Sequence, residues 1–206
     1  DAVPRGYRIA ARPGGVSRRA ASLLREDIDA LEEAWETAGP GPAQRVVKVQ
    51  APGPVTLAAQ LELGNGHRAI TNAGALRDLA ESLTEGMSVH AAEVARRLGT
   101  EVVVQFDEPS LPAALAGRLT GVTGVTPVHP VDQIAAIELL DRCASAGPTV
   151  VHCCAAGLPW NILQRSSIQA VSVDVSVLDP ADLDGIGEFV ESGRVVLLGV
   201  VPISAP

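Results

Sequence analysis

The sequence is poor in aromatic residues, which make up only 2% of its 206 residues. Proteins that bind single-stranded nucleic acid stack the bases on aromatic side chains, so this class is disfavoured. The formal net charge of −8 also argues against a phosphate-binding surface, because nucleic-acid binders concentrate Lys and Arg on one face. We therefore expect no nucleic-acid partner and a core built from Val, Leu, Ile and Ala.

Long apolar runs and targeting signals are also missing. No stretch approaches the roughly 18 continuous apolar residues of a membrane-spanning helix, and the first residues show no signal pattern. We therefore expect no membrane partner and a cytoplasmic location. The three cysteines, two of them adjacent, fit a disulfide framework poorly and fit a metal or reactive site in a reducing compartment better.

The overall composition is that of a folded globular protein, with 47% hydrophobic and 19% charged residues. The length suits one core, although an α/β barrel usually takes roughly 250 residues. We therefore predict a single, partial barrel domain over residues 1–206.

Helix and strand patterns alternate along the chain. Apolar residues recur at helical spacing from Ser17, a predicted N-cap, to Trp35, and again over residues 73–98, where Gly99 ends the pattern. Shorter helices are expected at residues 111–119, 132–146 and 181–191. Strands are expected at residues 46–49, 101–106, 149–153, 170–175 and 195–201.

The predicted strands are almost entirely apolar, which is typical of a parallel sheet covered by helices. We therefore predict an α/β fold, a (β/α)8 TIM barrel of which the sequence shows about five of the eight strands. An open, doubly wound sheet is the alternative. That fold usually carries a glycine-rich phosphate loop after an early strand, and the sequence has no G-x-G-x-x-G or Walker motif.

Functional side chains of a barrel collect where its strands end and loops begin. Polar residues stand at four of the predicted strand ends: Gln50 and Thr56; Gln105, Asp107 and Glu108; His152, Cys153 and Cys154; and Asp174 and Ser176.

The segment His152–Cys154 has the strongest signal for chemistry. Alternate residues of a strand share a face, so His152 and Cys154 are expected on one side and Cys153 on the other. Imidazole and thiolate together suit zinc, and Asp174 at the next strand end can add a carboxylate. The alternative is that these residues are simply buried, since free cysteine commonly behaves as a small hydrophobic residue.

Two acidic residues follow the second strand. Asp107 comes directly after the strand, where its carboxylate can hold a substrate ammonium group. Glu108 precedes a proline and is expected to cap a helix by accepting backbone N–H donors. Cys143 is expected to pack within a helix, and Arg96 and Arg97 are expected to face water at a helix end.

Several segments, taken together, resemble the C-terminal catalytic barrel of cobalamin-independent methionine synthase, in a short form. These segments are Gly53–Thr56, Gln105–Leu111, His152–Cys154, Ala170–Ser176 and Gly199–Val201. The resemblance implies a zinc enzyme that methylates the thiol of homocysteine to form methionine. Zinc lowers the pKa of a thiol, so that the nucleophilic thiolate exists at neutral pH. The implied methyl donor is methyl-tetrahydrofolate or a methylcorrinoid.

By matched position, the resemblance also assigns roles to residues. His152, Cys154 and Asp174 would ligate zinc, with Asp174 standing where the family has a glutamate. Asp107 would be the catalytic residue that holds the amino group of homocysteine, and Thr56 and Gln105 would also bind substrate. The family's last ligand, a cysteine on its final strand, has no counterpart in this sequence.

Two alternatives stay open. One is a related barrel, either uroporphyrinogen-decarboxylase-like or a coenzyme M methyltransferase, which would act on a different substrate. The other is a metal-free, non-catalytic relative of the family, suggested by the missing fourth ligand and by the shorter carboxylate side chain of Asp174.

Overall fold

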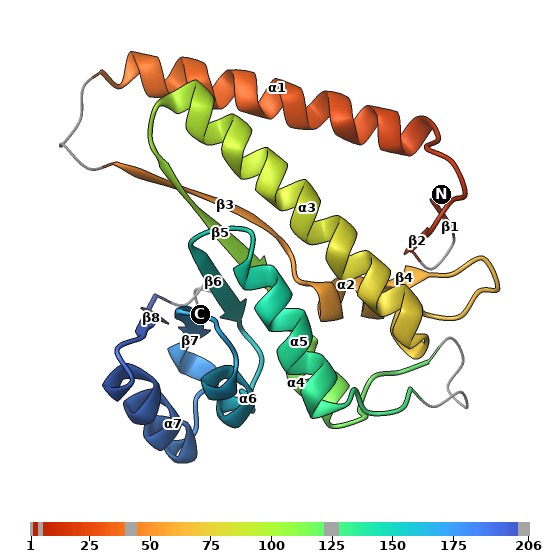
Figure 1. Ribbon diagram of the computed structural model, residues 1–206, viewed down its shortest axis with the longest axis vertical. Coiled ribbons are helices and arrows are strands. Elements are labelled where there is room, and N and C mark those ends of the chain that lie inside the picture. Colours follow the sequence, from red (N-terminus) through yellow and green to blue (C-terminus); the bar gives the residue numbers. More distant parts are fainter. Residues whose placement is uncertain (1, 4–5, 40–44, 122–127, 202–206) are drawn as a thin grey trace.

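The computed structural model describes residues 2–3, 6–39, 45–121 and 128–201 (Figure 1). Its main feature is an all-parallel sheet whose strands lie side by side in chain order. The strands are β3 (Val46–Pro52), β5 (Glu101–Asp107), β6 (Thr149–Cys153), β7 (Ala170–Asp174) and β8 (Val195–Gly199). All five predicted strands are thus confirmed, and their ends differ from the prediction by at most three residues.

Helices connect these strands. The long helices are α1 (Gly15–Thr37), α3 (Ala73–Leu98), α5 (Gln133–Ala144) and α7 (Pro180–Glu191). The short ones are α2 (Pro54–Gln60), α4 (Leu111–Leu115), α6 (Trp160–Arg165), and the 3₁₀ turns η1 (Ala69–Thr71) and η2 (Val175–Val177). None of the described helices combines the length and the apolar character needed to cross a membrane.

The predicted helix over residues 73–98 agrees with α3 at both ends. The Asn72 side chain caps its N-terminus by accepting a hydrogen bond from Ala75 N, and Gly99 ends it with a left-handed φ of 61°. Two other predictions are wrong in detail. Gly14, not Ser17, is the N-cap of α1, and α4 ends at Leu115 because the chain turns at Gly117 with a φ of 63°.

A second, small sheet lies beside α2 and is not predicted by the sequence. It contains β1 (Ala2–Val3), β2 (Gly6–Arg8) and β4 (Leu61–Glu62). Arg8 Nη2 lies 2.9 Å from Glu62 Oε2, so an ion pair reinforces the pairing of β2 with β4. Strands of two or three residues are too short to show a period, which is why the sequence does not reveal them.

The strand order distinguishes the predicted barrel from the alternative, a doubly wound sheet. A doubly wound sheet reverses its strand order at a switch point and carries helices on both faces. The described strands have no such reversal, and right-handed crossovers between parallel neighbours then place the connecting helices on one face. This arrangement is that of one part of an α/β barrel, whereas closure into a barrel is not shown by these five strands.

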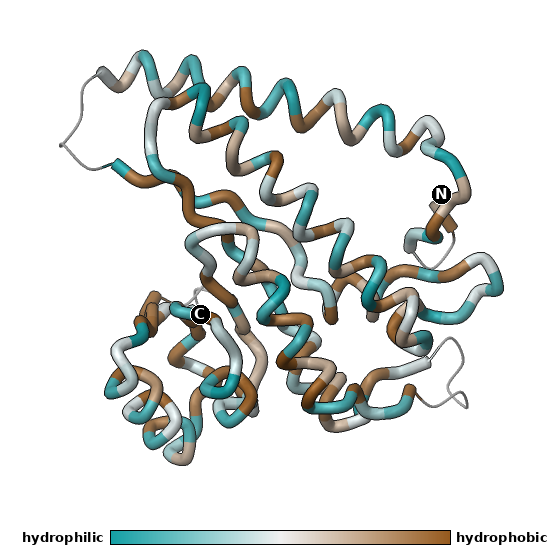
Figure 2. The backbone as a smooth tube through the Cα atoms, viewed as in Figure 1, coloured by the Kyte–Doolittle hydropathy of each residue, from teal (hydrophilic) through white to brown (hydrophobic). Residues whose placement is uncertain are grey.

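The core lies between the sheet and the helices. One group of buried side chains packs α2, α5, α6 and α7 on the sheet and includes Val151, Val171 and Phe189. A second group joins α1 and α3 to β5 and includes Ile28 and Phe106. Figure 2 shows hydrophobic residues concentrated on the strands, whereas α1 alternates hydrophobic and hydrophilic residues along its length.

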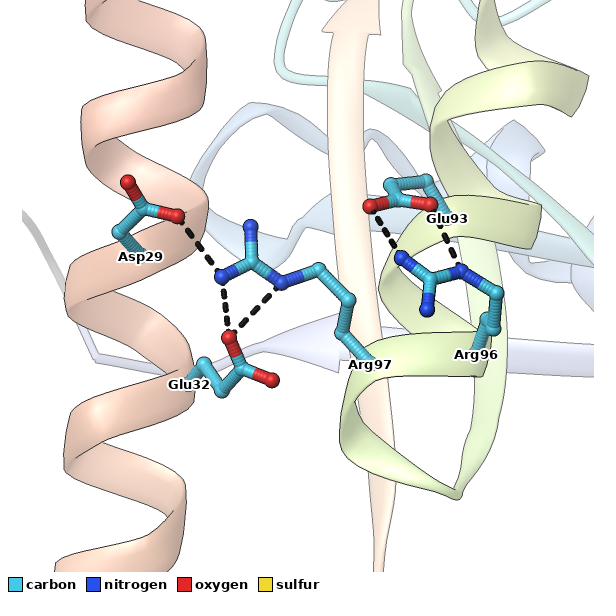
Figure 3. A network of polar contacts seen from close by, with 5 residues as sticks. All are labelled: Asp29, Glu32, Glu93, Arg96 and Arg97. Atoms are coloured by element: carbon cyan, nitrogen blue, oxygen red, sulfur yellow. Dashed lines mark hydrogen bonds and ion pairs between the residues drawn. The ribbon is translucent and has the colours of Figure 1, made fainter.

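The outermost helix, α1, is tied to α3 by Arg97 (Figure 3). Arg97 Nη2 lies 2.7 Å from Asp29 Oδ1, and its Nε donates to Glu32 Oε2 at 2.8 Å. Hydrogen bonds to Glu32 and Asp29 raise the pKa of Arg97. The prediction that Arg97 faces water is therefore wrong, whereas Arg96 is exposed and pairs with Glu93 of its own helix.

Candidate active site at the strand ends

The carboxyl ends of the parallel strands lie along one edge of the sheet. The register places Asp107 beside Pro52 on one side and beside His152 on the other. His152 in turn lies beside Ser172, two residues before Asp174 at the end of β7. The sheet thus brings Asp107, His152 and Asp174 to the same edge.

His152 is held by the neighbouring strand. Its Nδ1 lies 3.1 Å from Ser172 Oγ, and its Nε2 has no hydrogen-bond partner within the described part of the chain. A hydrogen bond at one ring nitrogen fixes the orientation of the ring and leaves the other nitrogen for a ligand or a substrate.

The two adjacent cysteines differ in accessibility. Cys153 is 2% exposed and belongs to the core, and burial raises the pKa of its thiol to about 11. Cys154 is exposed and follows the last residue of β6. The accessible thiol at this edge is therefore that of Cys154. Cys143 is fully buried in α5, where burial raises the pKa of its thiol, and its predicted packing role is confirmed.

Asp174 is held in place by the residues that follow it. Its Oδ1 accepts hydrogen bonds from Ser176 Oγ at 2.7 Å and from Ser176 N at 2.9 Å. These two hydrogen bonds lower the pKa of Asp174, and the nearby charge of His152 adds a smaller effect in the same direction. Asp174 is therefore a carboxylate at neutral pH.

The donor types at this edge suit zinc, which binds imidazole, thiolate and carboxylate ligands. Their arrangement does not complete a site. Within residues 2–3, 6–39, 45–121 and 128–201, no three His, Cys, Asp or Glu side chains lie close enough together to hold a metal ion. His152, Cys154 and Asp174 thus have the right chemistry for the ion without the geometry.

Glu108 is buried behind the same edge of the sheet and forms hydrogen bonds there. It is fully buried, and its carboxylate accepts hydrogen bonds from Val55 N at 2.8 Å, Thr56 N at 2.8 Å and Thr56 Oγ1 at 2.7 Å. The predicted capping role is confirmed, and the helix that Glu108 caps is α2, which follows a different strand. Burial raises the pKa of Glu108 to about 7, although these hydrogen bonds act to lower it.

Backbone hydrogen bonds extend this network across three strand ends. Gly53 N donates to Asp107 O at 2.7 Å, and Glu108 N donates to His152 O at 2.7 Å. A Cβ atom at residue 53 would lie 2.4 Å from side-chain atoms of Glu108, so only glycine fits there. Thr56 is buried in this network, and a contact between its hydroxyl and a substrate stays a prediction.

Asp107 is oriented by a side-chain hydrogen bond. Gln105 Nε2 donates to Asp107 Oδ1 at 2.6 Å, and Lys48 Nζ donates to Gln105 Oε1 at 2.6 Å. Lys48 is not among the site residues predicted from the sequence. The available signal is its spacing, because Lys48 and Gln50 alternate along the strand that leads into this edge.

The comparison with protein families covers the whole chain. Residues 1–206 match the family described as cobalamin-independent synthase, catalytic domain. No curated protein matches the chain. The family is that of methionine synthase catalytic domains, which supports a methyltransferase role. The chain therefore belongs to the cobalamin-independent methionine synthase family, as a catalytic domain.

Proposed function

We propose that this chain transfers a methyl group to the thiol of homocysteine, forming methionine, with zinc as its cofactor. The observation that carries the proposal is that Asp107, His152 and Asp174 lie at one edge of the sheet. The match of the whole chain to the family supports it. The exposed thiol of Cys154 follows the same edge.

Asp107 is the proposed binding group for the amino acid part of the substrate. Its Oδ1 is engaged by Gln105, whereas Oδ2 makes no hydrogen bond to any other described residue. A carboxylate oxygen in this state can accept a charge-assisted hydrogen bond from the ammonium group of homocysteine. Thr56 and Gln105 belong to the same proposed binding region.

His152, Cys154 and Asp174 are the proposed zinc ligands. Their imidazole, thiolate and carboxylate groups would hold the ion beside a substrate thiol, although the described part of the chain does not bring these three side chains together. Zinc, when bound, lowers the pKa of that thiol, so that the thiolate nucleophile exists at neutral pH. Ser172 contacts one ring nitrogen of His152 and leaves the other free. Hydrogen bonds from Ser176 lower the pKa of Asp174 and keep it ionised.

Methyl transfer can be assayed with the purified chain, zinc and either methyl-tetrahydrofolate or methylcobalamin as donor. Homocysteine should be converted to methionine, and coenzyme M should not be methylated. Asp107→Asn should lower kcat/KM for homocysteine by roughly 10- to 100-fold, because one charge-assisted hydrogen bond is lost. Glu101→Gln, an exposed change on the same strand, is the control and should leave kcat/KM unchanged.

Other outcomes would favour the alternatives. Methylation of coenzyme M in place of homocysteine would indicate a related barrel enzyme. The absence of any methylated product with both donors would contradict the proposal and favour a non-catalytic relative. The incomplete grouping of metal donors among the described residues is the observation that supports this second candidate.

A further inference from the structure

Lys48 is the only lysine in the sequence, because the other 15 of its 16 basic residues are arginines. It lies in β3 on the face of the sheet opposite the helices, which we call the inner face. Lys48, Val103, Val150, Ala170 and Leu197 line a groove of about 540 Å³ on this face. Lys48 is exposed and borders this mostly apolar groove, four residues before β3 ends at Pro52 on the edge that carries the candidate site.

The side-chain amide of Gln105 connects Lys48 to that site. Gln105 is 6% exposed, and its amide is bonded at both ends, to Lys48 Nζ and to Asp107 Oδ1. An ammonium group can only donate and a carboxylate can only accept, so these two partners fix which end of the amide faces Asp107. Without Lys48, the buried amide would keep only one of these two partners.

The spacing of the three groups also keeps Asp107 available. A direct ion pair with Lys48 would occupy the carboxylate and would compete with a substrate cation. With Gln105 between them, Lys48 acts two hydrogen bonds away and Asp107 Oδ2 stays without a partner within the described residues. Hydrogen bonds in such a chain polarise one another, so the charge of Lys48 strengthens the bond from Gln105 to Asp107.

We propose that Lys48 is a positioning residue that acts through Gln105 to hold Asp107 in the orientation that binds the ammonium group of the substrate. This inference rests on the proposed function and deepens it, because it explains which residues set the selectivity for an amino acid thiol. In this arrangement Gln105 contributes to substrate binding indirectly, through its hydrogen bond to Asp107.

A pair of ligands isolates this effect. Homocysteine and 4-mercaptobutanoate differ only in the amino group, and their affinities for the full chain can be measured by calorimetry in zinc-containing buffer. Lys48→Met should weaken homocysteine binding about threefold to tenfold, the effect of loosening one hydrogen bond, and should leave 4-mercaptobutanoate unaffected. Lys48→Arg should restore most of the affinity, because it keeps a cationic donor.

The charge-matched control is Arg96→Met, which removes an exposed cation on α3. It should change neither affinity. Equal weakening of both ligands by Lys48→Met, or no weakening of homocysteine, would overturn the positioning role. If the wild-type chain itself does not prefer homocysteine, the proposed function fails at Asp107, and the positioning role fails with it.

The hydrogen-bonded chain can be tested without any ligand. The side-chain NH₂ signals of Gln105, assigned by their loss in Gln105→Leu, should show slow hydrogen exchange in the wild-type chain. Lys48→Met should speed this exchange, and Arg96→Met should not. Unchanged exchange in Lys48→Met would overturn the proposal even if homocysteine binds, which separates its failure from that of the proposed function.

Discussion

Asp107 and Glu108 are neighbours in the chain with opposite surroundings. Asp107 is partly exposed at the edge of the sheet, whereas Glu108 is fully buried against the first turn of α2. Adjacent residues at a strand end point to opposite faces. The carboxylate of Asp107 therefore reaches the candidate site, and that of Glu108 stabilises the start of α2. A single Asp-Glu pair thus supplies both the proposed binding group and its support.

The buried carboxyl of Glu108 should make stability depend on pH. Its pKa is raised from 4.5 to about 7, so the folded chain holds this proton more tightly than the unfolded chain does. The resulting stabilisation is complete below pH 4.5 and is lost as the pH rises through 7. Between pH 5 and pH 8 this loss should be about 2 to 3 kcal/mol of unfolding free energy.

Urea unfolding at the two pH values can test this prediction with Glu108→Gln, which cannot ionise. The variant should lack this part of the pH dependence, and Glu101→Gln, on the exposed start of β5, should keep it. An identical pH dependence in Glu108→Gln and wild type would show that Glu108 does not titrate in this range.

The contact between Gly53 and Glu108 predicts the effect of a single methyl group. Gly53→Ala should destabilise the chain by about 1 to 3 kcal/mol, because its Cβ would overlap the Glu108 side chain. Gly64→Ala is the matched control, since a Cβ there meets no atom within 4 Å. Denaturant midpoints measure both, and equal midpoints for the two variants would rule out the predicted overlap.

At the scale of elements, the long helices and the strands could be predicted because their apolar periods extend over many residues. The helix over residues 73–98 is the best example, since Asn72 and Gly99 mark its ends in the sequence. The short α6 could not be predicted, because it depends on a distant partner. Trp160 Nε1 donates to Asp182 Oδ1 at 2.8 Å, which joins α6 to α7.

The contact between α1 and α3 is also non-local, and Arg97 should carry much of it. Arg97→Met should lower Tm and speed backbone hydrogen exchange in residues 15–37, because two carboxylates of α1 lose their shared cation. The difference in Tm from wild type should shrink in 1 M NaCl, since salt screens ion pairs at partly exposed sites. Arg96→Met should match wild type in both measurements, and no change in Arg97→Met would contradict this role.

For the whole molecule, strand order is what joins residues far apart in sequence into one site. The sequence could predict that polar residues follow four of the strands, and the register shows that two of them, Asp107 and His152, are neighbours. It could not predict that Lys48 reaches Gln105, since that contact depends on side chains from two strands. The roles of Asp107, Thr56 and Gln105 in substrate binding stay predictions, and so do the metal ligands, because the described donors do not form a group of three.

The most direct test of the central claim is the zinc content of the purified chain, measured by elemental analysis and X-ray absorption with and without homocysteine. We predict about one zinc per chain and one additional sulfur ligand when homocysteine binds. Cys154→Ser should lose zinc with little loss of fold, and Cys143→Ser should retain it. No bound zinc after reconstitution, or unchanged zinc in Cys154→Ser, would contradict the account.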